Sequence, residues 1–193
     1  MVFQDGGLYL DPEGVFRAGI VLDNLIHRGE MPVTIGVFVD PGEPDNRNAE
    51  YDAFDDAYAL LLLTEILPTV RQNYSITDDP DQWGICGGSS GGNCALTVAW
   101  YLPDRFRRVI SLQGSFEQTP NGNPYPRLIP KTPRKPLRIF LAAETRDAYY
   151  DEPLFNWFSS NLRVAAALAE RTTYVWSSAT VNTPSNPEET TAQ

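Results

Sequence analysis

The chain has 193 residues, of which 42% are hydrophobic and 11% aromatic, a composition typical of one globular domain rather than of a disordered chain. Its 25 acidic and 15 basic residues give a formal net charge of -10, which argues against nucleic acid or an anionic membrane surface as a partner. No apolar run approaches the roughly 20 residues that span a bilayer, and the first residues do not resemble a signal peptide. The cellular compartment and the oligomeric state stay open.

Strand-like and helix-like patterns alternate along the chain, which predicts an α/β fold with a mainly parallel sheet. The predicted strands cover residues 1–4, 33–39, 82–86, 108–113, 137–142 and 173–176. One predicted helix ends near residue 27, and the others cover residues 49–70, 92–102 and 154–170. We expect Pro68 to fall near the end of the second of these helices, because proline lacks the backbone N–H that a helix interior needs.

Two segments are predicted to be irregular. Residues 119–136 hold six of the chain's 16 prolines, so we expect a surface loop that is either a wall of a substrate pocket or a passive connection. From residue 177 onward the chain is rich in Ser, Thr, Asn, Pro and Glu and offers almost nothing to bury. The predicted organisation is therefore a single domain over residues 1–176, followed by a disordered tail over residues 177–193.

The two cysteines, Cys86 and Cys94, lie on either side of a glycine-rich segment. Two cysteines without partnering histidines cannot form a zinc site, so we expect buried free thiols. No pattern in the sequence indicates a metal or a cofactor.

The segment between these cysteines carries the pattern G-x-S-x-G of a nucleophile elbow, in which a strand turns sharply into a helix and presents a serine above the sheet. Two registers fit, one centred on Ser89 and the other on Ser90. We favour Ser89, because its register leaves Gly91 and Gly92 to open the helix against the sheet. A flexible Gly-Ser linker is the alternative, but strong strand and helix patterns flank the segment.

The remaining parts of a serine hydrolase site can be sought from chain order. The N–H of Ser90, directly after the nucleophile, is one expected oxyanion donor, and Gly7, after the first strand, is the expected second. An ordinary glycine turn is the alternative for Gly7. The acid should follow a later strand, where Asp147 is preferred to Glu144; a solvated carboxylate is the alternative for both.

The base is the difficulty, because the only histidine of the chain is His27. The surrounding residues resemble the last turn of a helix closed by Gly29, where a cation complements the helix dipole. We therefore interpret His27 as structural. Chain order also argues against it, since the base of this arrangement follows the acid.

The sequence resembles the esterases related to enterochelin esterase and esterase D, within the α/β-hydrolase superfamily. The resemblance covers residues 1 to about 176 and rests, besides the elbow, on FQDG at 3–6, DNLI at 23–26, VFVDPG at 37–42, EYD at 50–52, EILP at 65–68, ITDDP at 76–80 and QGSF at 113–116. It implies a three-layer fold, Ser89 as the nucleophile, Asp147 as the acid and a small ester as the substrate. Relatives of this kind cleave siderophore esters, carbohydrate-linked acyl esters or thioesters.

Two departures from this family pattern lead to further expectations. The family has strands before the one at residues 1–4, so we expect the chain to begin inside the domain. The family also places its catalytic histidine shortly after the last strand, where this chain reads SSATVNTPSNPEE. A shifted reading frame through this segment can encode Asp-Gly-Glu-His, so we expect a frameshift near Ser177, which the gene sequence would test.

These observations lead to two functional hypotheses. The first is a serine esterase scaffold that forms an acyl-enzyme on Ser89 but is nearly inactive, because it lacks the histidine base. The second is a non-catalytic fragment or binding module that keeps the hydrolase pocket.

Overall fold

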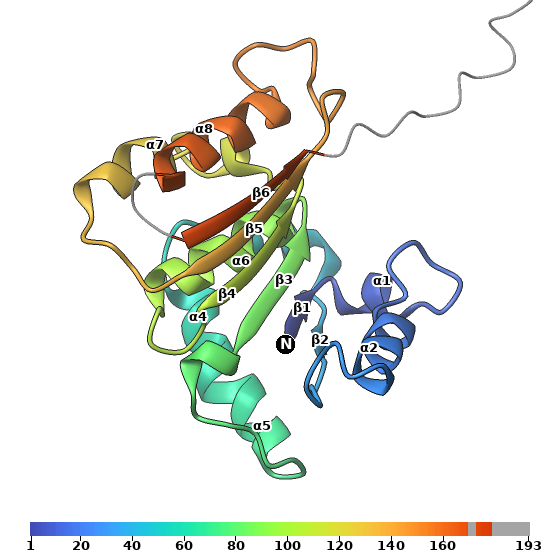
Figure 1. Ribbon diagram of the computed structural model, residues 1–193. Coiled ribbons are helices and arrows are strands. Elements are labelled where there is room, and N and C mark those ends of the chain that lie inside the picture. Colours follow the sequence, from blue (N-terminus) through green and yellow to red (C-terminus); the bar gives the residue numbers. More distant parts are fainter. Residues whose placement is uncertain (170–172, 179–193) are drawn as a thin grey trace, which may run out of the picture.

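A computed structural model describes residues 1–169 and 173–178 of the chain. Its centre is a six-stranded sheet with the strand order β2-β1-β3-β4-β5-β6, in which every neighbouring pair is parallel (Figure 1). The strands are β1 (Val2–Gln4), β2 (Val37–Val39), β3 (Gly84–Gly88), β4 (Arg108–Leu112), β5 (Arg138–Ala143) and β6 (Thr173–Ser178). The prediction of an α/β fold with a mainly parallel sheet is confirmed.

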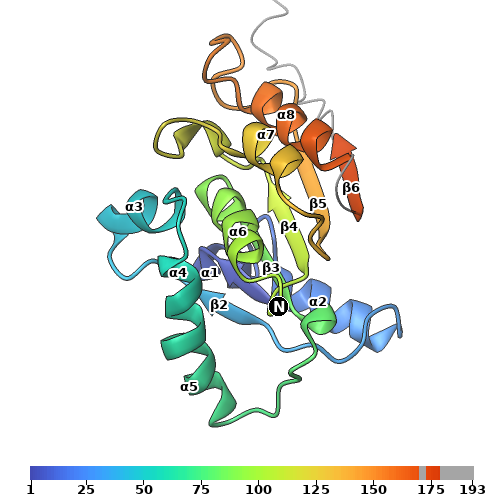
Figure 2. The ribbon, with the colours of Figure 1, turned by 90° about the vertical axis from the view of Figure 1, so that its left-hand side faces the viewer.

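Helices cover both faces of this sheet. One face carries α1 (Gly6–Leu10) and α2 (Ala18–His27), which lie over the β1–β2 side. The other face carries α6, flanked by α4 and α5 on one side and by α7 and α8 on the other (Figure 2). The helices of this second face are α3 (Arg47–Tyr51), α4 (Ala57–Leu61), α5 (Leu67–Arg71), α6 (Ser90–Tyr101), α7 (Tyr125–Leu128) and α8 (Trp157–Ala169).

The alternation of side chains along the strands divides the core into two parts. Val2 and Ile85 point into the large cluster beneath α4, α6 and α8, whereas their neighbours Phe3 and Cys86 point into a smaller cluster beneath α1 and α2. This is the arrangement expected when successive residues of a strand face opposite sides of a sheet. The molecule therefore has three layers. No helix among the described residues is long and apolar enough to cross a membrane.

The prediction of a single helix over residues 49–70 is wrong. It divides into α3, a break at residues 52–56, and a helical stretch made of α4, the π-helical segment η2 (Leu62–Ile66) and α5. Pro68 lies in the first turn of α5, where its missing N–H removes a hydrogen bond from the preceding turn. A π-helical turn is one way in which a helix accommodates such a loss.

Two other predictions need correction. The strand predicted over residues 33–39 forms only over β2, because β1 offers just three partners, the first of which pairs Val2 with Val37. Val33, ahead of it, is 88% exposed. The segment at residues 119–136 is not simply irregular either, since it contains α7 and the 3-10 helix η5 (Ile129–Lys131), whose Tyr125 and Ile129 are buried in the core.

The predicted tail, residues 177–193, lies outside the described residues except for Ser177 and Ser178, which belong to β6. Both cysteines are free and buried, as predicted.

Candidate active site

Ser89 lies at a sharp turn between β3 and α6. Its backbone dihedrals are φ 58° and ψ -126°, a conformation that non-glycine residues rarely adopt. A Cβ atom added to Gly87 would overlap the carbonyl group of Gly91 and lie 2.9 Å from its Cα. In the alternative register, centred on Ser90, the first glycine is Gly88, where an added Cβ atom would meet nothing closer than 3.7 Å. The strained residue and the first crowded glycine are therefore those of the register centred on Ser89.

The strand order places this turn beside the end of β1. Strand β1 lies between β2 and β3, so the chain first moves from β1 to one side of the sheet and then returns to the other side to form β3. The carboxyl ends of β1 and β3 therefore border the crevice at which the direction of these connections reverses. A Cβ atom on Gly91 would lie 3.0 Å from the Cβ of Gln4 and 3.2 Å from a carboxylate oxygen of Asp5. The residues that follow β1 thus contact the elbow, which is where parallel α/β sheets place their sites.

The two predicted oxyanion donors differ in their present hydrogen bonding. Ser90 is the first residue of α6, so its N–H is one of the helix N-terminal donors that have no acceptor within the helix. The N–H of Gly7 is directed at the carboxylate of Asp40, with N···O distances of 3.0 and 3.3 Å. Gly7 lies in α1 rather than in the simple glycine turn considered as its alternative. For this amide to bind an oxyanion, Asp40 would have to give way.

A buried carboxylate lies directly beneath the elbow. Asp52 is 4% exposed and accepts hydrogen bonds from the Ser90 hydroxyl at 2.8 Å, from the Ser115 hydroxyl at 2.9 Å and from the Asn93 amide at 3.1 Å. The Asn93 amide also donates to Thr119 Oγ1 at 3.0 Å. These bonds join the start of α6 to the loops after α3 and β4, and thereby hold the Ser90 peptide in place.

Sequence reasoning missed Asp52 in this role. The residue belongs to the segment at 50–52 that carried part of the family resemblance, but nothing in its local pattern indicates that it contacts a serine 38 positions later. Only the three-dimensional arrangement of α3 and α6 brings them together.

Asp147 lies in the loop after β5, two strands away from β3 on the same edge of the sheet. It is 9% exposed, and one of its carboxylate oxygens accepts a hydrogen bond from the N–H of Ala148 at 2.7 Å. The other oxygen is buried and has no hydrogen-bond partner among the described residues. Burial raises the pKa of Asp147, and the nearby charge of Glu144 adds to this effect.

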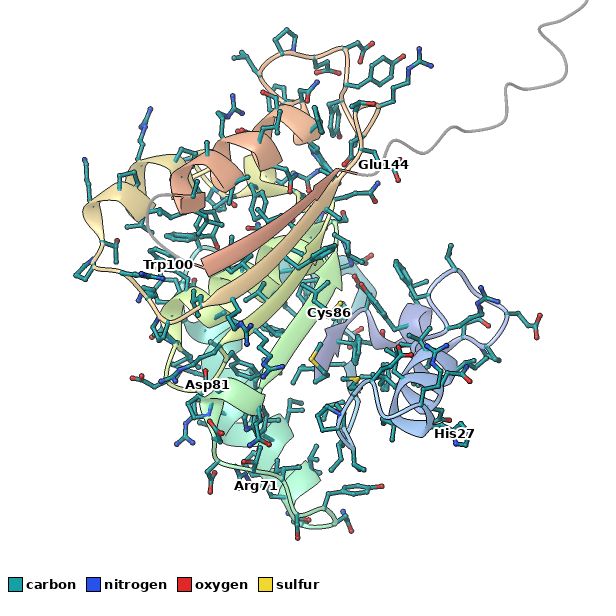
Figure 3. All side chains as sticks on the ribbon, viewed as in Figure 1. His27, Arg71, Asp81, Cys86, Trp100 and Glu144 are labelled. Atoms are coloured by element: carbon teal, nitrogen blue, oxygen red, sulfur yellow. The ribbon has the colours of Figure 1, made fainter. Side chains whose placement is uncertain are left out.

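Glu144, the other candidate for the acid, lies in a different environment. Glu144 is half-buried at the end of β5, where Figure 3 labels it, and its carbonyl oxygen accepts a hydrogen bond from the Asp147 N–H at 3.2 Å. A buried carboxylate oxygen without a partner is what a triad acid would offer to a histidine N–H.

His27 is not near this edge of the sheet. It is the last residue of α2, exposed to solvent, and Gly29 follows with φ 70° as expected for a helix C-terminus. Figure 3 shows the His27 label at the outer end of α2, well away from Cys86 in β3. The structure therefore brings Ser89, Ser90 and the residues after β1 together, places Asp147 on the same edge, and leaves His27 apart.

A cavity of about 740 Å³ opens beside Asp52, although neither Ser89 nor Asp147 lines it. It is lined by residues of α3 and the following loop, of the segment after β4, and of the loop between β5 and α8. Pro120 belongs to the lining, so the start of the predicted wall at residues 119–136 does contribute to it. The lining residues are Asn48, Ala49, Asp52, Ala53, Glu117, Gln118, Pro120, Tyr149, Glu152, Phe155 and Trp157.

The chain is similar to known esterases. The sequence model of the family described as Putative esterase matches residues 1–179. The chain is 34% identical over 115 residues to the iron(III) enterobactin esterase of Dickeya dadantii, an alignment that covers 60% of this chain and 26% of that protein.

Solved structures of esterases are also similar to this chain. The enterobactin esterase of Shigella flexneri, crystallised in the presence of enterobactin, superposes with a TM-score of 0.76 at 25% identity and covers 93% of this chain and 45% of that one. A ferulic acid esterase superposes with a TM-score of 0.66 at 16% identity, covering 93% of this chain and 76% of that one, which shows the shared fold. The chain thus spans less than half the length of the enterobactin esterases that it matches.

Proposed function

This chain belongs to the Putative esterase family, and we propose that it is a scaffold for the hydrolysis of carboxylic esters through an acyl-enzyme on Ser89. The observation that carries the proposal is the strained conformation of Ser89 between β3 and α6, with φ 58° and ψ -126°. Backbone strain of this kind costs about 1–3 kcal/mol and persists only where the surrounding structure enforces it. A nucleophile elbow is the established reason for such a turn in an α/β-hydrolase fold.

In the proposed reaction the Oγ of Ser89 attacks the ester carbonyl carbon, and the carbonyl oxygen acquires a negative charge. The N–H of Ser90 donates a hydrogen bond to this oxyanion, and Gly7 supplies the second if Asp40 moves away. Collapse of this intermediate expels the alcohol and leaves the acyl group on Ser89. Water then hydrolyses this acyl-enzyme to release the acid and regenerate the serine.

Both steps need a base that accepts a proton and returns it to the leaving group. We assign to Asp147 the role of the triad acid, whose task is to orient a histidine, but the only histidine of the chain is exposed His27 at the end of α2. Loss of a triad member lowers turnover by on the order of 10⁴- to 10⁶-fold. We therefore propose that ester turnover by this chain is very low.

The test compares the chain with its Ser89→Ala and Ser159→Ala variants, using p-nitrophenyl acetate and a fluorophosphonate probe. Ser159 lies on α8 outside the site and serves as the matched control. We expect slow turnover that added imidazole increases, since it supplies a base from solution, and slow labelling mapped to Ser89 by mass spectrometry. After subtraction of the protein-free rate at the same imidazole concentration, both should disappear in Ser89→Ala and persist in Ser159→Ala. Robust Ser89-dependent turnover without imidazole would contradict the missing-base proposal, and labelling of Ser90 instead would contradict the assigned nucleophile.

A second candidate function is a binding module that retains the hydrolase pocket. The observation that favours it is the exposed position of the chain's one histidine, together with the 740 Å³ cavity beside the elbow. This candidate predicts ligand binding without any Ser89-dependent turnover, even in imidazole. The named relatives make siderophore esters one candidate class of ligand for either function.

A further inference from the structure

The cavity beside the elbow has an aromatic wall made of Tyr149, Phe155 and Trp157. The ring centroid of Tyr149 lies 6.4 Å from that of Phe155 and 6.3 Å from that of Trp157. Tyr149 and Phe155 are 46% and 54% exposed, whereas large aromatic side chains are usually more deeply buried. The π-faces of these rings are therefore partly available to a ligand.

The charged groups of the lining are all acidic. They are Asp52, Glu117 and Glu152, and no lysine or arginine is found among the described residues that line the cavity. Glu117 forms an ion pair with Arg163, and Asp52 is satisfied by its three buried hydrogen bonds. Glu152 lines the cavity, is exposed and forms no ion pair with any of the residues that the structure describes.

Trp157 completes the aromatic wall. It is 9% exposed and lines the cavity, whereas its indole nitrogen is buried and has no acceptor within the described part of the chain. Trp157 therefore contributes part of its ring to the wall rather than a hydrogen-bond donor to the cavity.

The cavity is linked to the proposed nucleophile through Asp52. This residue belongs to the lining and accepts a hydrogen bond from the hydroxyl of Ser90, the residue next to Ser89. No residue of the elbow itself lines the cavity, so Asp52 is the point at which the two meet.

We propose that this cavity binds esters that carry an ammonium group, and that it discriminates against anionic esters. This inference rests on the proposed function for its link to Ser89, but the binding itself does not depend on catalysis. Aromatic faces attract ammonium cations through their negative quadrupole, and quaternary ammonium groups are bound in this way in aromatic cages. Glu152, which forms no ion pair with the described residues, adds a favourable charge for a cation. An anionic ester would be repelled by the same carboxylate, and no lysine or arginine lines the cavity to attract it.

The test uses three phenyl acetates that differ only in their para substituent: trimethylammonium, tert-butyl or sulfonate. The first two have nearly the same shape, so their difference isolates the positive charge. Binding is measured by calorimetry on the full chain carrying Ser89→Ala, so that turnover does not interfere. We expect the trimethylammonium ester to bind about tenfold more tightly than the tert-butyl ester. We expect the sulfonate ester to bind more weakly than both.

Matched variants locate the site. Tyr149→Leu keeps an apolar side chain but removes the π-face, so it should lower affinity for the trimethylammonium ester about fivefold and leave the tert-butyl ester unchanged. Tyr150→Leu, at the exposed neighbour outside the cavity lining, should change neither. Glu152→Gln should weaken binding of the cation about twofold to fivefold, whereas Asp151→Asn, with the same change in net charge, should not. Phe155→Leu repeats the aromatic test at a second exposed position if Tyr149→Leu does not fold.

Equal affinity for the three esters, preference for the sulfonate, or no measurable binding of any of them would overturn the inference. So would equal effects of the Tyr149 and Tyr150 substitutions. If the cation binds selectively but Ser89 neither labels nor turns over ester, then the binding site stands and the proposed esterase function fails. The two proposals are thereby tested separately.

Discussion

Ser89 and Asp147 show opposite ways in which a fold can prepare a residue for chemistry. Ser89 has a strained backbone conformation, which is possible because Gly87 has no Cβ atom that would overlap the carbonyl group of Gly91. Asp147 is unstrained but buried, with one carboxylate oxygen bonded to Ala148 and the other without a partner among the described residues. Both features reduce the stability of the folded state, and neither improves core packing. Such local costs are typical of functional positions.

The burial of Asp147 predicts a pH-dependent stability. Its pKa is raised in the folded state from the ordinary value of 3.8, so the folded chain binds the proton more tightly than the unfolded chain. Below the unfolded pKa the carboxyl is neutral in both states and causes no penalty. As the pH rises from there through the folded pKa, the free energy of unfolding falls, and at higher pH the loss is constant.

Urea unfolding of the chain and of Asp147→Asn, measured from pH 3 to pH 7, would check this expectation. The asparagine keeps the acceptor for the Ala148 N–H but does not titrate. We expect the parent chain to lose stability relative to the variant as pH rises across this window and then to run parallel to it. The Ser159→Ala variant, which changes no titrating group, controls for substitution alone. A constant difference between parent and Asp147→Asn at all pH values would contradict the assignment.

At the scale of elements, α3 is attached to the end of β1 through Arg47 and Tyr51. The guanidinium of Arg47 forms two hydrogen bonds of 2.7 Å with the carboxylate of Asp5, and the hydroxyl of Tyr51 accepts one of 3.2 Å from the Asp5 N–H. Asp5 itself is 8% exposed and has φ 56° at the start of α1. These contacts fix the loop after β1 against the elbow, since Gly91 lies beside Asp5.

This attachment predicts a large difference between two arginine substitutions. Arg47→Met leaves the buried carboxylate of Asp5 without its partner, which should lower the free energy of unfolding by about 2–4 kcal/mol. Arg28→Met breaks the exposed ion pair with Glu30, in which both side chains are more than half exposed, and should cost less than about 1 kcal/mol. Urea unfolding at pH 7 measures both. Equal costs for the two variants would contradict the role of Arg47.

Elements that depend on local sequence patterns could be predicted, whereas elements that depend on contacts between distant segments could not. Strands β3 to β5 lie within two residues of their predicted bounds, because burial in a parallel sheet gives continuous apolar runs. The elbow was also predictable, because the close contact that excludes a Cβ atom at Gly87 is made with Gly91, which is near it in the sequence. The break between α3 and α4 depends on how these two helices pack on α6, which no periodicity in the sequence records.

The contacts that complete the site were not predictable. Asp52 reaches Ser90 across 38 positions, and Asp40 reaches the Gly7 N–H across 33. Both depend on the order of strands in the sheet rather than on any local pattern. The sequence therefore indicated the candidates Ser89, Ser90, Gly7 and Asp147, whereas the carboxylates that contact Ser90 and the Gly7 N–H were found only in the fold.

At the scale of the whole molecule, the net charge of -10 acts on stability as well as on ligand choice. Excess negative charge repels itself in the compact state. Of the six described ion pairs, three have both side chains exposed and offset little of this repulsion. The same excess extends into the cavity, whose charged lining residues are all acidic. The long-range field thus favours cationic over anionic ligands before any contact is made.

This field predicts the sign of the salt effect. At pH 7, sodium chloride should raise the free energy of unfolding, because screening weakens a net repulsion over a Debye length that falls from about 30 Å at 0.01 M to about 10 Å at 0.1 M. Near the isoelectric point of about 4.5 the net charge vanishes, so the increase should disappear. Urea unfolding at both pH values and both salt concentrations measures the effect. A chain that salt destabilises at pH 7 would instead be held together by its ion pairs, and the acidic excess would not be the dominant electrostatic contribution.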